Sequence, residues 1–233
     1  MKVAIIPARG GSKRIPLKNV REFCGKPIIG WSIEAAFSAN IFDRIIVSTD
    51  DAGIAEVARS FGAEVPFVRP PDLADDFATT QAVISHAIKW LIEAGNDPSL
   101  VCCLYATAPF SQAKDIASAM GMLEASSHDF VMPVTSFPYP VERALVVNGD
   151  SELSMLDPAF VNARSQDLHE AFHDAGQFYC GRKDAWLDAR SIFSAKTLAL
   201  PLPRYRVQDI DTLEDWHRAE LLFKVMQKSG SDF

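Results

Sequence analysis

The residues best suited to chemistry form a short basic stretch near the N-terminus, from Ala8 to Asn19. It contains the glycine pair Gly10 and Gly11, and its cations stand at positions 9, 13, 14 and 18. Successive backbone N–H groups in a glycine-rich turn form a concavity that binds anions, and the surrounding cations would neutralise a polyphosphate. The stretch therefore predicts a nucleoside triphosphate site. Neither common phosphate-loop motif is present, and the GGSKR string alone is equally compatible with a solvated surface turn.

A pair of carboxylates near the other end of the chain is the second candidate for chemistry. Asp209 and Asp211 are separated by Ile210. In an extended segment, residues i and i+2 point to one side and their Cα atoms are about 7 Å apart. Two such carboxylates can share one Mg²⁺ ion, which favours few carboxylates together with substrate phosphates and water. The alternative is that Asp211, with Thr212, caps the next helix while Asp209 is merely exposed.

The elements that must position these residues alternate between strand and helix. The basic stretch follows an apolar run, Val3-Ala4-Ile5-Ile6, typical of a buried parallel strand. Further strands are expected at Asp43–Ser48, Ala63–Val68, Leu100–Leu104, Phe130–Val134, Ala175–Arg182 and Thr197–Leu202, and helices at Pro27–Asn40, Ala52–Phe61, Thr79–Ala94, Lys114–Glu124 and Leu213–Met226. This order predicts an α/β fold: a Rossmann-like, mostly parallel sheet flanked by helices.

One segment departs from this alternation. Between Thr135 and Phe172 the pattern becomes irregular, and Asn148-Gly149-Asp150 marks a hairpin turn between two short apolar runs. We therefore expect one domain over residues 1–233, with a β-rich arm at 135–172 inserted in it. The tail from Ser229 to Phe233 is expected to fray.

Composition restricts the class of protein. The 233 residues are 48% hydrophobic, enough for one full core, and the net charge of −7 argues against nucleic acid as the main partner. No run approaches the roughly 20 apolar residues of a membrane span, and the N-terminus does not resemble a secretory signal. The four cysteines lack metal-site spacing and are expected to be reduced thiols. These features predict a cytoplasmic protein without a membrane partner.

The string IPARGGSKRIPLKN resembles the N-terminal motif of the CMP-sugar synthetases (acylneuraminate cytidylyltransferases), which activate acidic sugars with CTP. The resemblance implies the fold of the nucleotide-diphospho-sugar transferases. It also implies that Arg9 and Lys18 meet the CTP phosphates and that Asp209 and Asp211 bind the catalytic Mg²⁺, which makes these four the candidate catalytic residues. The nucleotide-binding residues that it implies are Ala8, Arg9, Gly10, Gly11, Ser12, Lys13, Lys18, Asn19, Arg69 and Thr79, although Thr79 is equally suited to cap a helix.

Two strings that would face the sugar differ from the sialic acid synthetases. Tyr105 stands where that branch has a glutamine, and Ala175 stands where it has an asparagine. The strings YATAPF and HDAGQFY most resemble the branch that activates pseudaminic acid, a nine-carbon nonulosonic acid. The resemblance implies that Tyr105, Thr107, Gln177 and Tyr179 bind the sugar. Sialic acid, legionaminic acid and Kdo remain alternative substrates, and a catalytically inert nucleotide-binding regulator is the alternative from another class.

The arm is expected to mediate homodimer formation, because in this family such an arm reaches the active site of the partner. Arg143, Arg164 or His169 would then contact the sugar carboxylate bound by the neighbour. His169 and His173 are also four residues apart, as in a metal pair on a helix, but no third ligand at suitable spacing is apparent. We therefore expect them not to bind a metal.

Overall fold

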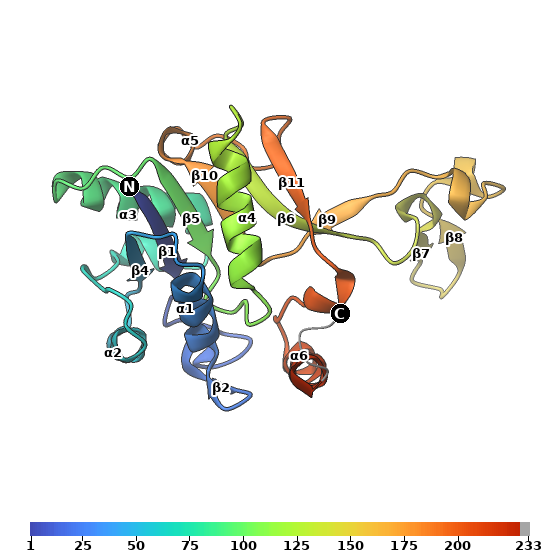
Figure 1. Cartoon of the computed structure of the whole chain (residues 1–233). Coiled ribbons are helices and arrows are strands. Elements are labelled where there is room, and N and C mark those ends of the chain that lie inside the picture. Colours follow the sequence, from blue (N-terminus) through green and yellow to red (C-terminus); the bar gives the residue numbers. More distant parts are fainter. Residues whose placement is uncertain (229–233) are drawn as a thin grey trace.

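The computed structural model describes residues 1–228, and its centre is one twisted sheet (Figure 1). Seven strands form it, in the order β11-β6-β10-β5-β1-β4, with β9 paired to β6 beside this path. β1 pairs in parallel with both β4 and β5, β11 is parallel to β6, and β10 runs antiparallel to β5 and β6. The α/β fold class and its mostly parallel sheet are confirmed.

The elements follow the expected alternation closely. The strands of the main sheet are β1 (Lys2–Pro7), β4 (Arg44–Ser48), β5 (Leu100–Leu104), β6 (Phe130–Ser136), β9 (Phe172–Asp174), β10 (Phe178–Arg182) and β11 (Thr197–Pro201). The helices are α1 (Ile28–Ser38), α2 (Ala52–Ser60), α3 (Thr80–Glu93), α4 (Ala113–Glu124), α5 (Lys183–Leu187) and α6 (Leu213–Lys228). Two small antiparallel pairs complete the structure: β2 (Glu22–Phe23) with β3 (Lys26–Pro27), and β7 (Leu145–Val147) with β8 (Leu153–Met155).

Helices cover both faces of the sheet because its strands are apolar on both sides. α1, α2 and α4 pack on one face in a core that includes Ile6, Ile33 and Leu104. α3 and α5 pack on the other face around Ile5, Ile88 and Trp186. Every residue of β5 is buried, as its uninterrupted apolar sequence predicts. The sheet edge where β1, β4 and β5 end therefore has a rigid base.

The expected strand at Ala63–Val68 is wrong. Only Glu64 forms an isolated parallel bridge, opposite Ile46. Pro66 carries no N–H, so it cannot donate to a ladder of hydrogen bonds with β4. His169 and His173 are also not on a helix, because His173 lies in β9. The predicted fraying of the tail falls outside the described residues.

A bulge separates β9 from β10 along one side of β6. Val134 lies opposite Asp174, whereas Val131 lies opposite Cys180, so six residues on this side span the same stretch as three residues of β6. Gly176 has a positive φ of 63°, which glycine adopts without strain. The bulge carries Gln177 to the edge where β5 ends, and there its carbonyl accepts a 2.9 Å hydrogen bond from the Tyr105 N–H.

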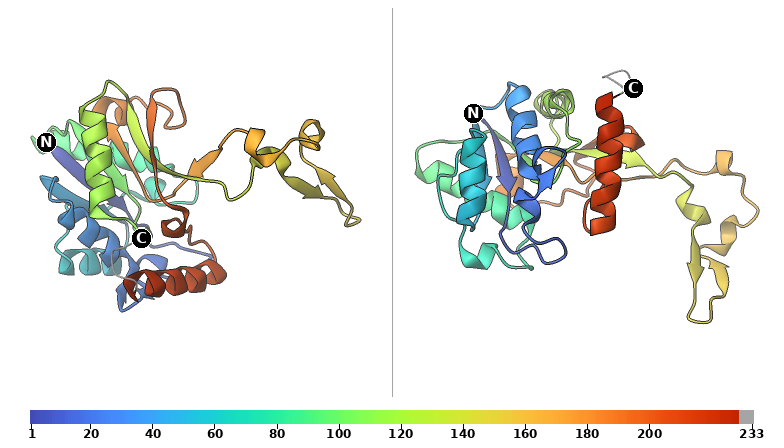
Figure 2. Two further views of the ribbon diagram at one scale, coloured as in Figure 1. Left: turned by 45° about the vertical axis from the view of Figure 1, so that its right-hand side comes forward. Right: turned by 90° about the horizontal axis from the view of Figure 1, so that it is seen from below.

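The arm leaves the main body between β6 and β9 and projects well away from it (Figures 1 and 2). Its β7–β8 hairpin forms a separate two-stranded sheet around the Asn148 turn. The excursion occupies the segment between β6, which extends through Ser136, and β9, which begins at Phe172.

A third apolar cluster joins the two stretches that sequence analysis selected. Ile15 of the basic stretch and Ile210 of the acidic pair are both buried in it, together with Phe23 and Phe110. α6 contributes Trp216 and covers the cluster. Because Ile15 and Ile210 share one core, the charged residues beside them are held close together.

Gly181 in β10 tests how tightly the centre of the sheet is packed. A Cβ atom there would lie 2.5 Å from the Phe130 ring and 2.5 Å from the indole nitrogen of Trp186. Both rings are fully buried and cannot move aside freely. We expect Gly181→Ala to lower the free energy of unfolding by about 1–3 kcal/mol, the usual cost of overpacking, when measured by urea denaturation.

Gly121→Ala in α4 is the matched control, because no atom lies within 4 Å of its added Cβ. This variant should gain about 0.5–1 kcal/mol from the higher helix propensity of alanine. Equal effects of the two substitutions would contradict the tight packing that we describe around Gly181.

Candidate active site

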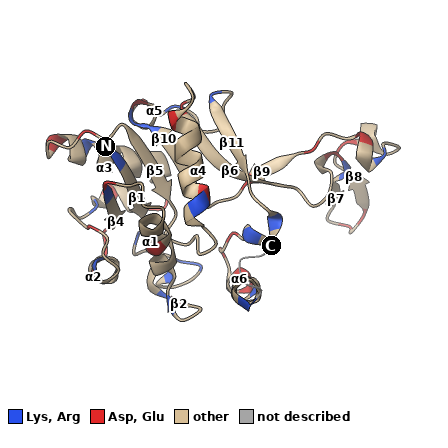
Figure 3. Cartoon of the chain, in the orientation of Figure 1, with Lys and Arg blue, Asp and Glu red and all other residues tan. Residues whose placement is uncertain are grey.

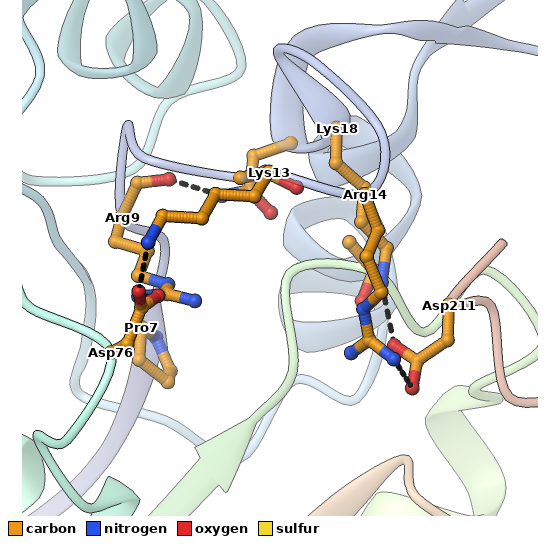
Figure 4. Close-up of a pocket in the computed structure, with 10 residues that line it drawn as sticks. Pro7, Arg9, Lys13, Arg14, Lys18, Asp76 and Asp211 are labelled. Carbon is orange, nitrogen blue, oxygen red and sulfur yellow. Dashed lines mark hydrogen bonds and ion pairs between the residues drawn. The ribbon is translucent and has the colours of Figure 1, made fainter.

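A cavity of about 400 Å³ opens at the sheet edge where β1 ends. It brings together residues from four separate parts of the chain (Figure 4). Its lining consists of Pro7, Arg9, Ser12, Lys13, Arg14, Lys18, Asn19, Asp76, Thr107 and Asp211. Five of the predicted nucleotide-binding residues, the predicted sugar contact Thr107 and the predicted metal ligand Asp211 thus share one cavity.

Backbone hydrogen bonds fix the shape of the basic loop. The Ala8 N–H donates to the carbonyl of Ser48 at 2.9 Å, which continues the β1–β4 pairing past the end of β1. The Gly10 N–H donates to Asp50 Oδ1 at 3.0 Å, and the Asn19 side chain donates to the Arg9 carbonyl at 2.8 Å. Asn19 therefore closes the loop on itself.

The two glycines of the loop have different roles. A Cβ atom on Gly10 would lie 2.9 Å from Asp51 Oδ2, and the other oxygen of that carboxylate caps α2 through the Ile54 N–H. Gly10 is thus required for the loop to pass the start of α2. No atom lies within 4 Å of a Cβ added to Gly11. Its lack of a side chain instead leaves the backbone open to a ligand.

Two groups of ion pairs stand on opposite sides of the cavity (Figure 4). On one side Asp76 accepts from Arg9 at 2.6 Å and from Lys13 at 2.5 Å. Hydrogen bonds from Lys13 and then Arg9 lower the pKa of the Asp76 carboxyl, so it stays ionised at neutral pH. On the other side Asp211 pairs with Arg14 at 2.8 Å and with Lys18 at 3.5 Å.

The alternative that Asp211 caps the last helix does not match the structure. Thr212 and Asp215 form the cap instead: the Asp215 N–H donates to the Thr212 hydroxyl, and the Thr212 N–H donates to the Asp215 carboxylate. Hydrogen bonds to the carboxylate from the Thr212 hydroxyl, and then from the Thr212 N–H, lower the pKa of Asp215. The Asp211 carboxylate is thus left to face the cavity and its cations.

The donor set fits magnesium better than a metal that needs a complete protein cage. Among residues 1–228 there is no group of three or more His, Cys, Asp or Glu side chains that could hold an ion. Mg²⁺ is usually bound by one or two carboxylates, with phosphates and water completing its shell. Asp211 meets this requirement at the cavity. Asp209 is exposed, does not line the cavity and accepts from the N–H of Ile210, so its role as a ligand stays a prediction.

Of the five predicted nucleotide-binding residues outside the cavity lining, Arg69 and Thr79 do not belong to the basic loop. Arg69 is only 4% exposed and donates to the hydroxyl and the carbonyl of Ser48. Burial lowers its pKa to about 10, so the guanidinium remains charged at neutral pH. Thr79 accepts from the Ala82 N–H and caps α3. Thr79 therefore has the helix-capping role that was its alternative. Contact of Arg69 or Thr79 with a nucleotide stays a prediction.

A chain of hydroxyl groups lies at the same sheet edge, next to the cavity residue Thr107. The Tyr179 hydroxyl donates to Asp174, and the Tyr105 hydroxyl lies 3.5 Å from both the Tyr179 hydroxyl and the Thr80 side chain. Burial is the main cause that raises the pKa of Tyr105 and Tyr179. Both phenols therefore stay protonated and can act as hydrogen-bond donors.

Gln177, the fourth predicted sugar contact, is 3% exposed. Its amide nitrogen donates to the Arg206 carbonyl at 2.7 Å, and its amide oxygen accepts from the Ser111 hydroxyl at 3.4 Å. Protein groups thus occupy both ends of this side chain. Its contact with a sugar stays a prediction, while its structural contacts are clear.

Sequence reasoning did not select Asp76 or Asp174 as site residues, and it counted Arg14 only among the cations around the glycine-rich turn. Asp76 occurs in the segment that supplied Arg69, but its charge alone does not reveal that it pairs with Arg9 across 67 positions. Asp174 directly precedes Ala175, the residue that stands where the sialic acid synthetases have an asparagine. Its partner Tyr179 lies beyond the bulge, and no sequence period predicts that contact.

Comparison with known proteins identifies the family. The profile of the family described as cytidylyltransferase matches residues 3–216. The chain belongs to the cytidylyltransferase family.

Relatives agree with this assignment, and a solved structure is similar in fold. The pseudaminic acid cytidylyltransferase of Campylobacter jejuni subsp. jejuni serotype O:2 is 44% identical over 228 residues, which cover 98% of each chain. The CMP-N,N'-diacetyllegionaminic acid synthase of Legionella pneumophila subsp. pneumophila is 31% identical, covering 97% of this chain and 98% of the relative. In fold, the chain is similar to CMP:2-keto-3-deoxy-manno-octonic acid synthetase complexed with CTP, with a TM-score of 0.68, 18% identity and coverage of 96% and 98%.

The ion pairs of this cytidylyltransferase predict that Asp76 competes with a bound anion for the cations of the loop. Asp76 occupies Arg9 and Lys13, the cations that a phosphate group would need. Asp76→Asn should therefore bind inorganic pyrophosphate several-fold more tightly at low ionic strength, by removing a competing charge. Isothermal titration calorimetry at low and high salt measures this effect.

Asp97→Asn is the matched control, since Asp97 forms a similar exposed pair with Lys183 away from the cavity. It should leave pyrophosphate affinity unchanged. If Asp76→Asn weakens the binding, Asp76 instead holds Arg9 and Lys13 in the orientation that the anion requires.

Proposed function

We propose that this chain transfers the cytidylyl group of CTP to pseudaminic acid, an acidic nine-carbon sugar, and releases pyrophosphate. The observation that carries the proposal is the cavity itself, where a basic glycine-containing loop faces the Asp211 carboxylate. This arrangement suits a triphosphate bound together with a divalent cation. The 44% identity to the pseudaminic acid enzyme of Campylobacter jejuni supports this sugar among the acidic sugars used by the family.

In this reaction the protein has to position the two substrates and stabilise charge, and it does not need to form a covalent bond with either of them. The anomeric hydroxyl of the sugar attacks the α-phosphorus of CTP as the bond to pyrophosphate breaks. Arg9 and Lys18, both at the cavity, would bind the triphosphate and stabilise the charge that develops on it. The open backbone at Gly11 and the Ser12 side chain would complete the phosphate cradle.

Asp211, with Asp209, would hold Mg²⁺. When bound, Mg²⁺ polarises the α-phosphate and lowers the pKa of the attacking hydroxyl. Asp211 is paired with Arg14 and Lys18. Turning those cations toward the phosphates frees the carboxylate, so we expect the nucleotide and the ion to bind together.

Tyr105, Tyr179 and Thr107 would bind the sugar. Tyr105 and Tyr179 stay protonated because burial raises their pKa. Tyr105 can donate to an oxygen of the substrate, whereas Tyr179 donates its proton to Asp174 and would accept a hydrogen bond from a substrate hydroxyl or N–H group. Asp174 accepts from Tyr179 and thereby orients its ring. We retain Gln177 in this group as a predicted contact.

The arm would form a homodimer with a second copy of the chain. Its hairpin exposes many large apolar side chains, and a two-stranded hairpin is marginally stable alone in water. The exposed residues are Leu145, Val146, Val147, Leu153 and Leu156. Arg143, Arg164 or His169 would then reach the sugar bound by the neighbouring subunit.

We expect the reaction to take place in the cytoplasm. All four cysteines are free thiols, and three of them are fully buried, which suits a reducing compartment. Within residues 1–228, no helix has the length and apolar character needed to cross a bilayer.

A substrate panel tests the reaction directly. Pyrophosphate release from CTP should be fastest with pseudaminic acid, compared with sialic acid, legionaminic acid and Kdo.

Two substitutions in the cavity test the residue roles. Asp211→Ala should abolish Mg²⁺-dependent release, and Arg9→Ala should lower kcat/KM by about a hundredfold or more, as expected for an electrostatic transition-state contact. The surface variant Asp97→Ala is the matched control and should retain full activity.

Two outcomes would decide against the proposal. Faster turnover of another acid would make this chain a synthetase for that sugar. CTP binding without turnover of any acid would favour the inert nucleotide-binding regulator, for which the intact basic loop and Asp211 would serve binding alone.

The arm makes a prediction about assembly. Val146→Lys combined with Leu153→Lys should convert a dimer to a monomer in light scattering coupled to size-exclusion chromatography, because two charges would enter the apolar interface. Ile92→Lys, at an exposed position of α3, is the matched control and should leave the mass unchanged. A dimer that persists in the double variant would show that the arm does not hold the subunits together.

A further inference from the structure

We call residues 206–211, which include Asp209 and Asp211, the acidic loop. A buried ion pair holds its first residue. Arg206, five positions before Asp211, donates to the Asp115 carboxylate at 2.5 Å and 3.4 Å through its two terminal nitrogens. Arg206 is 5% exposed and Asp115 is 9% exposed. Asp115 belongs to the first turn of α4, which packs on the main sheet. The ion pair therefore ties the start of the acidic loop to the rigid part of the domain.

The main chain of Arg206 is held as firmly as its side chain. Its carbonyl accepts from the Gln177 amide, whose oxygen in turn accepts from Ser111. All four residues of this network (Arg206, Asp115, Gln177 and Ser111) are at most 9% exposed. They come from three separate parts of the chain, since Ser111 and Asp115 both lie around the start of α4, and the network fixes the position of Arg206 in three dimensions.

The other end of the loop is fixed by packing. Ile210 is 1% exposed and lies in the cluster with Ile15 and Trp216. Between these two anchors Gln208 is only partly buried and Asp209 is exposed. Asp211 follows Ile210 directly and faces Arg14 and Lys18. The position of its carboxylate thus depends on both anchors.

A buried ion pair is not needed for stability as such. Well-packed apolar side chains of similar volume often give equal or greater stability, because the two charges lose their hydration on burial. Buried pairs are more useful for selecting one conformation. This contrast allows the stabilising and positioning effects of the pair to be separated by experiment.

We propose that Arg206 and Asp115 are positioning residues, which set the acidic loop so that Asp211 faces the cavity, with Gln177 and Ser111 as supporting members. The inference rests on the proposed function, in which Asp211 holds Mg²⁺ together with CTP. It also gives Gln177 a role that does not require contact with the sugar.

The test compares Mg²⁺ affinity with stability in the double variant Arg206→Met/Asp115→Leu. Calorimetry measures Mg²⁺ binding to the full chain in the presence of CTP and without sugar, so that no turnover occurs. We expect Mg²⁺ affinity to fall by at least about tenfold, as is usual when residues that orient a metal ligand are lost. The melting temperature should stay close to that of the unchanged chain, because the apolar pair replaces the buried charges.

Arg182→Met is the matched control. Arg182 donates to the carbonyls of Leu123, Ser126 and His128 at the opposite end of α4, so its loss removes a comparable set of hydrogen bonds away from the acidic loop. This variant should melt at a lower temperature but bind Mg²⁺ normally. Arg206→Lys, which keeps the charge but not the two-pronged geometry, provides a second test should the double variant fail to fold, and its Mg²⁺ affinity should also fall.

The outcomes separate the two proposals. If Asp211→Ala binds Mg²⁺ as well as the unchanged chain, the metal assignment of the proposed function is wrong. If Asp211→Ala loses Mg²⁺ while the double variant and Arg206→Lys bind it normally, the proposed function stands and the positioning role of Arg206 and Asp115 is overturned.

Discussion

The crowding of positive charge in the first loop is the constraint on which the site depends. Arg9, Lys13, Arg14 and Lys18 lie within ten residues and line one cavity, so they repel one another unless anions stand between them. Asp76 and Asp211 supply those anions from distant parts of the chain and divide the cations into two pairs. Figure 3 shows how charged segments otherwise scatter over the molecule. The two carboxylates offset only part of the loop charge, which leaves the cavity attractive to a polyphosphate.

The fold brings Asp76 and Asp211 to the loop. Parallel strands end at a common edge, so the loops after β1, β4 and β5 meet without special contacts. The acidic loop begins five residues after β11, which runs parallel to β6. Its position also depends on Ile210 in the third apolar cluster and on the ion pair between Arg206 and Asp115. Burial and one desolvated charge pair thus add to what strand order does for this loop.

The sequence predicted local features well, because apolar period, glycine position and helix caps are written in neighbouring residues. Thr79 caps α3, as one of its two predicted roles requires, and the Asn148 turn joins β7 to β8 as expected. It predicted poorly what depends on contacts between distant segments. The pairing of Asp76 with Arg9 and the bulge that buries Gln177 both follow from the surrounding tertiary structure. Spacing alone could not distinguish a metal-ligand role of Asp211 from a helix cap, and the family resemblance favoured the metal-ligand role.

The reciprocal cap formed by Thr212 and Asp215 explains how a carboxylate at a helix start can remain available for chemistry. A helix N-terminus leaves unpaired N–H groups that would otherwise attract the nearest acidic side chain. Here Asp215 accepts from the N–H groups of both Thr212 and Asp211, and the Thr212 hydroxyl accepts in return. Because those donors are already satisfied, the Asp211 carboxylate is drawn to Arg14 and Lys18 across the cavity. The same two cations would leave it for a bound triphosphate, so the cap, by occupying the helix N–H groups, keeps one carboxylate free to exchange a cationic side chain for a metal ion.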